Sequence, residues 1–225
     1  MSVFFVTSSG TEIGKTFVSS HFVRQLKARG DKVLALKPVL SGITPETVAG
    51  SDTALLLEAM GREVTEESFE AITPWHFKEA MSPDMAAARE GRTVPFRSVV
   101  SFCAEAARAN HDHLLIEGVG GLMVPLDDSH LVLDWMKALT RETALTPILV
   151  VGSYLGTVSH TLTALKVMKD EGLAPGAIIV SQSEEAPVPL EETCEVIARF
   201  AGGVPIVPLP RLAAGQEAPD LLSWF

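Results

Sequence analysis

Lys15 and Thr16 stand where a lysine and a hydroxyl can act on the same anion. They close the stretch Gly10-Thr11-Glu12-Ile13-Gly14-Lys15-Thr16, which follows an apolar run at 3–6 and precedes an amphipathic segment. A strand, a glycine-containing turn and a helix in this order present backbone N–H groups to a phosphate chain. Lys15 would reach the β- and γ-phosphates of a nucleotide, and the Thr16 hydroxyl would ligate magnesium. The tripeptide Gly-Lys-Thr also occurs in ordinary loops, and Ser9 stands where the usual pattern has its first glycine.

Further polar residues directly follow other apolar runs of strand length. Lys37 follows the run at 33–36, Glu117 follows 114–116, and Gly152-Ser153 follows 147–151. In open parallel sheets ligands bind outside the carboxyl ends of the strands. A charge placed directly after buried apolar positions needs a partner, so we expect Lys37 and Glu117 to face a shared cleft. The alternative for each is a loop charge in solvent.

Two carboxylates are candidates for holding magnesium beside Thr16. Glu117 opens Glu117-Gly118-Val119-Gly120-Gly121, whose glycines allow the backbone to approach a nucleotide closely. Asp52 is the second candidate, although Ser51 or Asp52 also suits the start of a helix. The two roles are compatible. Because magnesium takes few carboxylates and keeps several waters, Thr16, Asp52, Glu117 and the phosphates would complete its shell.

The elements that must position these residues alternate along the chain. We predict strands at 3–6, 33–36, 114–116, 147–151, 177–180 and 204–207. A helix follows the first strand, with Val18, Phe22 and Leu26 on one face and Gly30 as its stop. Further helices are predicted at 53–60, 95–110, 132–140, 159–172 and 190–200. This alternation predicts an α/β fold with a doubly wound, mainly parallel sheet and helices on both faces.

Composition narrows the class of protein. The chain has 225 residues, of which 47% are hydrophobic and 20% charged, so we expect a single domain spanning 1–225. A net charge of −10 argues against a nucleic-acid or anionic-membrane partner. Cys103 and Cys194 form no CxxC pair, which argues against a disulfide framework or a zinc site. No apolar run reaches the roughly 18 residues of a membrane span, and no secretory signal is evident, so we expect a cytoplasmic protein.

An ordered set of motifs resembles the dethiobiotin synthetase family, ATP-dependent ligases of biotin synthesis, over nearly the whole chain. The resemblance implies a P-loop NTPase-like fold and a homodimer whose active site is completed by the neighbouring subunit. The matching segments are Val6-Thr7 with Thr11–Thr16, Lys37-Pro38-Val39 with Ser41-Gly42, Ser51-Asp52, Ser82-Pro83 with Glu90-Gly91-Arg92, Glu117–Gly121 with Pro125-Leu126, and Val150-Val151-Gly152 with Leu155-Gly156.

The resemblance also implies a reaction: 7,8-diaminononanoate, CO2 and ATP, with Mg2+, give the cyclic urea dethiobiotin through a carbamate and a carbamic-phosphoric anhydride, releasing ADP and phosphate. Lys37 and Lys15 are implied as catalytic. Thr11 and Ser41 are implied to contact the carbamate or diamine, and Gly152, Ser153, Tyr154 and Leu155 to seat the substrate carboxylate across the dimer interface. The implied nucleotide site comprises Glu12, Ile13, Gly14, Lys15, Thr16, Phe17, Asp52, Glu117, Gly118, Val119, Gly120, Ser181, Gln182, Leu209, Pro210 and Arg211, with Glu217 nearby.

The chain departs from the family pattern at three places. Gly10 replaces an aspartate of the loop, Ser181-Gln182 replace an asparagine that is often followed by aspartate beside the nucleotide base, and Arg211 replaces an aromatic residue. These departures leave the base preference open.

Two other classes of protein share parts of this pattern. The first is a nucleotide-switch ATPase of the division or partition type, which binds a protein or a membrane. Such proteins carry a second lysine early in the loop, where this chain has Ser8, Ser9 and Gly10. The second is a cobalamin-type amide synthetase, whose glutaminase domain has no room in 225 residues.

Overall fold

A six-stranded parallel sheet forms the centre of the computed structural model, which describes residues 1–213, 216 and 218–225. Its strand order is β2-β5-β1-β6-β7-β8, so β1, which carries the phosphate loop, is flanked by β5 and β6. The strands are β1 (Ser2–Ser8), β2 (Val33–Leu36), β5 (His113–Glu117), β6 (Leu145–Gly152), β7 (Ala177–Ser181) and β8 (Ile206–Leu209).

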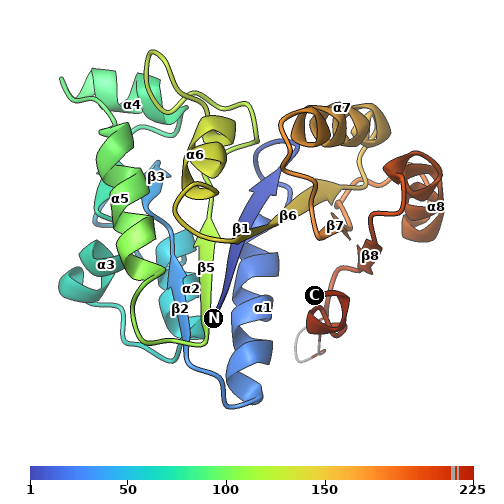
Figure 1. Cartoon of the computed structure of the whole chain (residues 1–225), viewed down its shortest axis with the longest axis horizontal. Helices are drawn as coiled ribbons and strands as arrows, with labels where there is room; N and C mark the ends of the chain where they lie inside the picture. Colours follow the sequence, from blue (N-terminus) through green and yellow to red (C-terminus); the bar gives the residue numbers. More distant parts are fainter. Residues whose placement is uncertain (214–215, 217) are drawn as a thin grey trace.

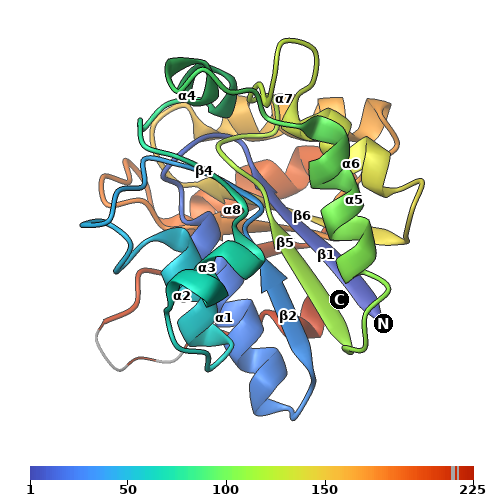
Figure 2. The ribbon, with the colours of Figure 1, turned by 90° about the vertical axis from the view of Figure 1, so that its left-hand side faces the viewer.

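Helices cover both faces of this sheet (Figures 1 and 2). On one face lie α1 (Lys15–Ala28), α2 (Asp52–Ala59) and α3 (Glu66–Ile72); on the other lie α5 (Phe96–Ala106), α6 (Val132–Leu139) and α7 (Thr157–Asp170). Helix α8 (Leu190–Ala201) packs beside α7. The predicted doubly wound fold is confirmed.

The central strands are buried on both faces, as expected of a parallel sheet under two helical layers. Phe4 packs edge-to-face on Phe22 of α1, with ring centroids 4.9 Å apart, and Phe5 packs likewise on Trp135 of α6. These two pairs join β1 to the helices on either side. Helix α1 is therefore packed against the strand that leads into the loop.

Several short elements were absent from the sequence prediction. Strands β3 (Val39–Ser41) and β4 (Trp75–Phe77) form a separate two-stranded parallel sheet, and α3 and α4 (Pro83–Arg89) complete this part of the chain. Three-residue strands and seven-residue helices are too short for a periodic signal. Helix α3 instead depends on a capping box between Thr65 and Ser68.

Some predicted boundaries were wrong. The last strand begins two residues later than predicted and continues to Leu209, and α5 ends at Ala106 instead of residue 110. Helix α7 begins and ends two residues earlier than predicted. A short 3-10 helix at Leu222–Trp224 lies against α1.

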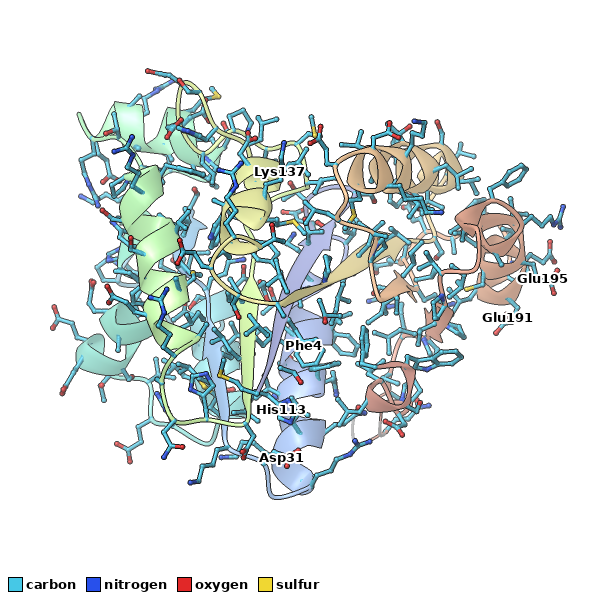
Figure 3. All side chains as sticks on the ribbon, viewed as in Figure 1. Phe4, Asp31, His113, Lys137, Glu191 and Glu195 are labelled. Carbon is cyan, nitrogen blue, oxygen red and sulfur yellow. The ribbon has the colours of Figure 1, made fainter. Side chains whose placement is uncertain are left out.

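The two ends of the parallel strands have different surroundings. At the amino ends, His113 at the start of β5 lies 3.4 Å from the Asp31 carboxylate and near Phe4 (Figure 3). The polar residues singled out in the sequence lie at the opposite end of the sheet, where β1, β2, β5, β6 and β7 end. None of the helices traced for residues 1–213, 216 and 218–225 has the length and apolar character of a bilayer span.

Candidate active site

The phosphate loop runs from Ser9 to Gly14, between β1 and α1. Gly14 has a left-handed backbone (φ 94°) and so does Glu12 (φ 58°), which is unusual for a residue with a side chain. Gly14 precedes the first residue of α1 and supplies no side-chain cap, which leaves first-turn N–H groups for an anion. The backbone of the loop is therefore arranged for a phosphate.

Position 14 of the loop requires glycine, whereas position 10 has room for a side chain. A Cβ at Gly14 would lie 2.6 Å from Ser181 Oγ, whereas a Cβ at Gly10 would meet nothing within 4 Å, and Gly10 has no positive φ. We expect Gly14→Ala to weaken ATP binding at least about tenfold, because strain of about 1–3 kcal/mol is forced on the loop. Gly10→Ala should change it less than about threefold. Calorimetric titration of both variants checks this, and equal losses would contradict it.

Lys15 is buried at the start of α1, where its Nζ lies 3.1 Å from Ser8 Oγ. The Ser8 hydroxyl also lies 2.6 Å from the Gly10 carbonyl and 2.9 Å from the Gly120 carbonyl. Burial, and next the nearby ammonium of Lys37, lower the pKa of Lys15 to about 8. Lys15 is thus an incompletely compensated cation that a phosphate would stabilise.

This lowered pKa predicts a pH dependence of nucleotide binding. A bound phosphate raises the pKa of Lys15, so binding takes up a proton once the free protein has lost it. ATP affinity should therefore fall as pH rises through about 8 and be about tenfold weaker at pH 9 than at pH 7. Calorimetry at several pH values in buffers of different ionisation enthalpy measures both affinity and proton uptake. A Lys15→Arg variant should show no such slope.

Thr16, Lys37, Asp52 and Glu117 form one connected cluster. The Thr16 hydroxyl lies 2.6 Å from Asp52 Oδ1 and 2.8 Å from Glu117 Oε1. Lys37 Nζ lies 2.8 Å from Asp52 Oδ2, 2.7 Å from Glu117 Oε1 and 2.9 Å from the Gly118 carbonyl. Lys37 and Glu117 are 1% and 0% exposed, so they are buried partners and not loop charges in solvent.

The charges in this cluster stabilise one another. Burial by itself lowers the pKa of Lys37, but the Glu117 and Asp52 carboxylates outweigh burial and raise it above its usual value. Burial likewise opposes ionisation of Asp52, yet the Lys37 ammonium keeps the pKa of that carboxyl below its usual range. Lys37 therefore stays protonated while Lys15 begins to titrate near pH 8.

The cluster fits a magnesium ion bound together with phosphates. Glu117 Oε2 is buried and makes no hydrogen bond to any residue that the structure describes. Ser51 caps α2, with its hydroxyl accepting from Ala54 N–H, which leaves the Asp52 carboxylate to Thr16 and Lys37. Among the described residues no group of three or more His, Cys, Asp or Glu could hold a metal alone. Two carboxylates and a hydroxyl suit magnesium whose other ligands are phosphates and water.

A cavity of about 730 Å³ opens beside the loop. Ser41 lines it, and its hydroxyl is buried without a hydrogen-bond partner among the described residues. Of the residues singled out in the sequence, those lining this cavity are Thr11, Glu12, Ile13, Gly14, Lys15, Thr16, Phe17, Lys37, Ser41, Asp52, Val119 and Gly120. Glu117 and Gly118 reach it through their contacts with Lys37.

A second cavity, of about 390 Å³, lies on the other side of the loop. It shares Glu12, Ile13, Gly14 and Phe17 with the first and adds Ser181, Gln182, Pro210 and Arg211 from the sequence prediction. Leu209 is buried in β8, and its carbonyl accepts a hydrogen bond from the Gln182 N–H. Glu217 lies outside the described residues.

The segment Gly152–Leu155 lines neither cavity of this chain. Ser153 and Ser183 exchange hydrogen bonds between backbone N–H and hydroxyl groups, both at 2.9 Å. The Tyr154 hydroxyl lies 2.9 Å from His160 Nδ1, and the Leu155 side chain is 84% exposed. That the segment Gly152–Leu155 seats the substrate carboxylate stays a prediction.

Some lining residues were not singled out as site residues. The larger cavity is also bordered by Leu40, Gly42, Ile43, Thr47, Gly50, Ser51, Ala80, Met81, Ser82, Pro83 and Val124, and the smaller one by Ser183, Glu184 and Leu212. Ser82-Pro83 stood out in the sequence only as a family motif. Their place beside Ser41 depends on β3 and β4, which the sequence pattern did not predict.

Comparison with known proteins shows the family of the chain. Residues 2–215 match the family model described as "AAA domain". The ATP-dependent dethiobiotin synthetase of Acidiphilium cryptum is 47% identical over 100% of this chain and 97% of its own length. The synthetase of the same name from Bacillus subtilis strain 168 is 38% identical over 95% and 89%.

Solved structures show the fold alone. A ParA family ATPase from Chlorobium tepidum superposes with a TM-score of 0.52 at 17% identity, over 94% of this chain and 84% of the other. The chloroplast FtsY of Physcomitrella patens gives 0.54 at 16% identity, over 99% of this chain but 63% of the other. The identity over nearly the full length decides the family: the chain belongs to the ATP-dependent dethiobiotin synthetases and is an ATP-dependent ligase of the P-loop class.

Proposed function

We propose that this ligase joins 7,8-diaminononanoate to CO2 and closes the cyclic urea dethiobiotin, a step of biotin biosynthesis. One substrate amine adds to CO2 to give a carbamate, and a carbamate oxygen attacks the γ-phosphorus of ATP. ADP leaves, and a carbamic-phosphoric anhydride remains. The second amine then attacks the carbamoyl carbon, the ring closes and inorganic phosphate departs. The observation that carries the proposal is the buried Lys37 ammonium beside the phosphate loop.

The residues act mainly by position and charge. Lys15 neutralises the β- and γ-phosphates, and Lys37 lies where it can contact both the γ-phosphate and the carbamate. Fixed cations in a site with little water stabilise the charge that develops as the phosphoryl group moves. Thr11 and the Ser41 hydroxyl, which has no partner among the described residues, hydrogen-bond the carbamate or diamine. No side chain needs to form a covalent bond with the substrate.

Thr16, Asp52 and Glu117 would hold Mg2+, with Glu117 Oε2 as an oxygen still lacking a partner among the described residues. When bound, Mg2+ supplies charge neutralisation at the phosphates. Lys37 now lies between the two carboxylates, so it would share them with the ion or move toward the phosphates. That movement would place its ammonium at the reacting groups.

We further propose a cytoplasmic homodimer in which each chain forms one ligase domain. Leu155, exposed beside Gly152–Tyr154, is a side chain that such a contact would cover. In such a dimer the backbone donors of 152–155 would seat the substrate carboxylate of the neighbouring site. Analytical ultracentrifugation of the protein and of Leu155→Asp tests the dimer.

The decisive experiment combines the purified protein with MgCl2, ATP, bicarbonate and 7,8-diaminononanoate. Mass spectrometry follows the cyclic urea while phosphate is measured in the same sample. Product that requires every component supports the proposal. ATP hydrolysis without any urea would contradict it and favour a nucleotide-switch ATPase.

A further inference from the structure

Glu90 and Arg92 belong to a sequence motif to which the proposed reaction gives no role. They follow α4, which residues 78–82 connect to the short strand β4 (Figure 2). Glu90 Oε1 accepts a hydrogen bond of 2.8 Å from the Lys78 N–H, directly after β4. Because this bond joins the two ends of the segment, residues 78–90 form a closed loop that contains α4.

Arg92 reinforces the closure of the 78–90 loop. Its Nη1 donates to the His76 carbonyl at 3.2 Å and lies 3.0 Å from Glu90 Oε2. Its guanidinium lies over the Phe77 ring, 4.7 Å from the ring centre. The Glu90 carboxylate is thus bonded at both oxygens, and its side chain is 21% exposed. The bond from the Lys78 N–H, together with Arg92, lowers the pKa of this carboxyl.

The tip of the closed loop forms part of the larger cavity. Residues 80–83, which we call the 80–83 wall, line this cavity together with Ser41 and the phosphate loop. A Cβ at Gly42 would lie 3.1 Å from Ala80 Cβ, so the wall packs directly on the turn that follows Ser41. A displacement of the wall would therefore change the space beside the Ser41 hydroxyl.

The position of the wall depends on how the two ends of the loop are held. Within the described part of the chain, the hydrogen bonds of residues 79–82 are local: the Met81 N–H donates to the Glu79 carbonyl, and the Ala86 N–H donates to the Ser82 carbonyl. The bonds that tie the loop to its surroundings lie at its ends, where Glu90 and Arg92 contact β4 and the residue after it.

We propose that Glu90 and Arg92 are positioning residues for the diamine: by closing the 78–90 loop they set where the 80–83 wall stands beside Ser41. The inference rests on the proposed function, since it takes the larger cavity to hold the diamine. Neither Glu90 nor Arg92 lines that cavity, so both act through the wall. Loss of either side chain should weaken the use of diamine and leave nucleotide binding intact.

Steady-state kinetics of Glu90→Ala tests this directly. KM for 7,8-diaminononanoate should rise about tenfold while kcat changes less than about threefold, because the wall contacts the substrate equally before and during reaction. The dissociation constant of the β,γ-imido analogue of ATP, measured by calorimetry with Mg2+, should stay within about twofold. A mutation that only reduced the amount of folded protein would lower kcat and leave KM unchanged, so the two roles give different results.

Three further variants make the test specific. Glu90→Gln keeps an oxygen that can accept from the Lys78 N–H, so its diamine KM should stay within about threefold of the unaltered protein. Glu79→Ala is the matched control, because it removes the same charge from an exposed position of the same loop and should change this KM less than about twofold. Arg92→Ala should raise the same KM, and combining it with Glu90→Ala should add less than the two separate effects.

Hydrogen exchange tests the closure without any turnover. Amide hydrogens of residues 78–82 should exchange at least about tenfold faster in Glu90→Ala than in the unaltered protein or in Glu79→Ala. An unchanged diamine KM in Glu90→Ala, an equal loss of affinity for the ATP analogue, or a Glu90→Gln variant as impaired as Glu90→Ala overturns the inference. If the unaltered protein makes no urea, the proposed function itself fails, and unchanged exchange in Glu90→Ala then overturns the closure as well.

Discussion

Lys37→Met should lower kcat for dethiobiotin formation about a thousandfold, equivalent to about 4 kcal/mol of transition-state stabilisation. The methionine fills similar space but removes the buried ammonium placed between the phosphate loop and the Glu117 and Asp52 carboxylates. ATP binding should change less than about tenfold, because Lys15 and the loop N–H groups remain. Coupled phosphate and product assays measure kcat, and calorimetry measures ATP binding.

The same variant should also be less stable, by about 3 kcal/mol in the free energy of unfolding, because a fully buried Glu117 loses its counter-charge. Lys37→Met combined with Glu117→Gln removes both charges and should recover most of this stability without recovering activity. That pair of results separates the chemical role from the structural one. A Lys37→Met enzyme with more than a tenth of normal kcat would contradict the catalytic role. Lys32→Met, which alters an exposed lysine directly before β2, should behave like the unaltered protein.

Lys15→Met should weaken ATP binding about a hundredfold or more, because about 3 kcal/mol of charged hydrogen bonding to phosphate is lost. Turnover should fall with it. Calorimetric titration with the β,γ-imido analogue of ATP and Mg2+ gives the dissociation constant directly. Unchanged affinity would show that the loop does not hold the phosphates.

The effect of Lys15→Met on stability should be opposite to that of Lys37→Met. The pKa of Lys15 is lowered to about 8 in the folded protein from 10.5, so at pH 7 the folded state carries a buried charge that it disfavours. This penalty is complete below pH 8 and is relieved as pH rises toward 10.5. Removing the charge should raise the free energy of unfolding of the nucleotide-free protein at pH 7 by about 2 kcal/mol. Chemical denaturation at pH 7 compares the two variants, and a destabilised Lys15→Met would refute this view of the site.

Local pattern was sufficient to predict the frame of the molecule. Buried strands gave continuous apolar runs, and the loop before Lys15 carried its own residue signature. Because parallel strands end at one edge of the sheet, Lys37 and Glu117 could be assigned to one cleft before their 2.7 Å contact was known. For the start of α2 the sequence left Ser51 and Asp52 as alternative caps, because both stand where a helix begins, and the structure makes Ser51 the cap.

The cavity wall and the conformation of the phosphate loop could not be predicted, because they depend on contacts between segments that the sequence pattern does not report. The wall formed by Ser41, Met81 and Ser82 requires β3 to pair with β4, two three-residue strands separated by more than thirty positions. No periodicity can report so short a pairing. The left-handed backbone of Glu12, and the finding that position 10 does not require glycine, likewise depend on how the folded loop packs against Ser8 and Gly121.

The sequence by itself determined the parallel sheet, the phosphate loop and the charged residues at the strand ends, because each is encoded within a few consecutive positions. Only the tertiary structure decided which charges share partners: Lys37 contacts two carboxylates, whereas Lys15 contacts the Ser8 hydroxyl and its pKa is lowered to about 8. It also decided that the Gln182 oxygen is taken by the Arg211 N–H. Pairing and burial are properties of the folded chain, since the free energy of a charge or an amide depends on what surrounds it.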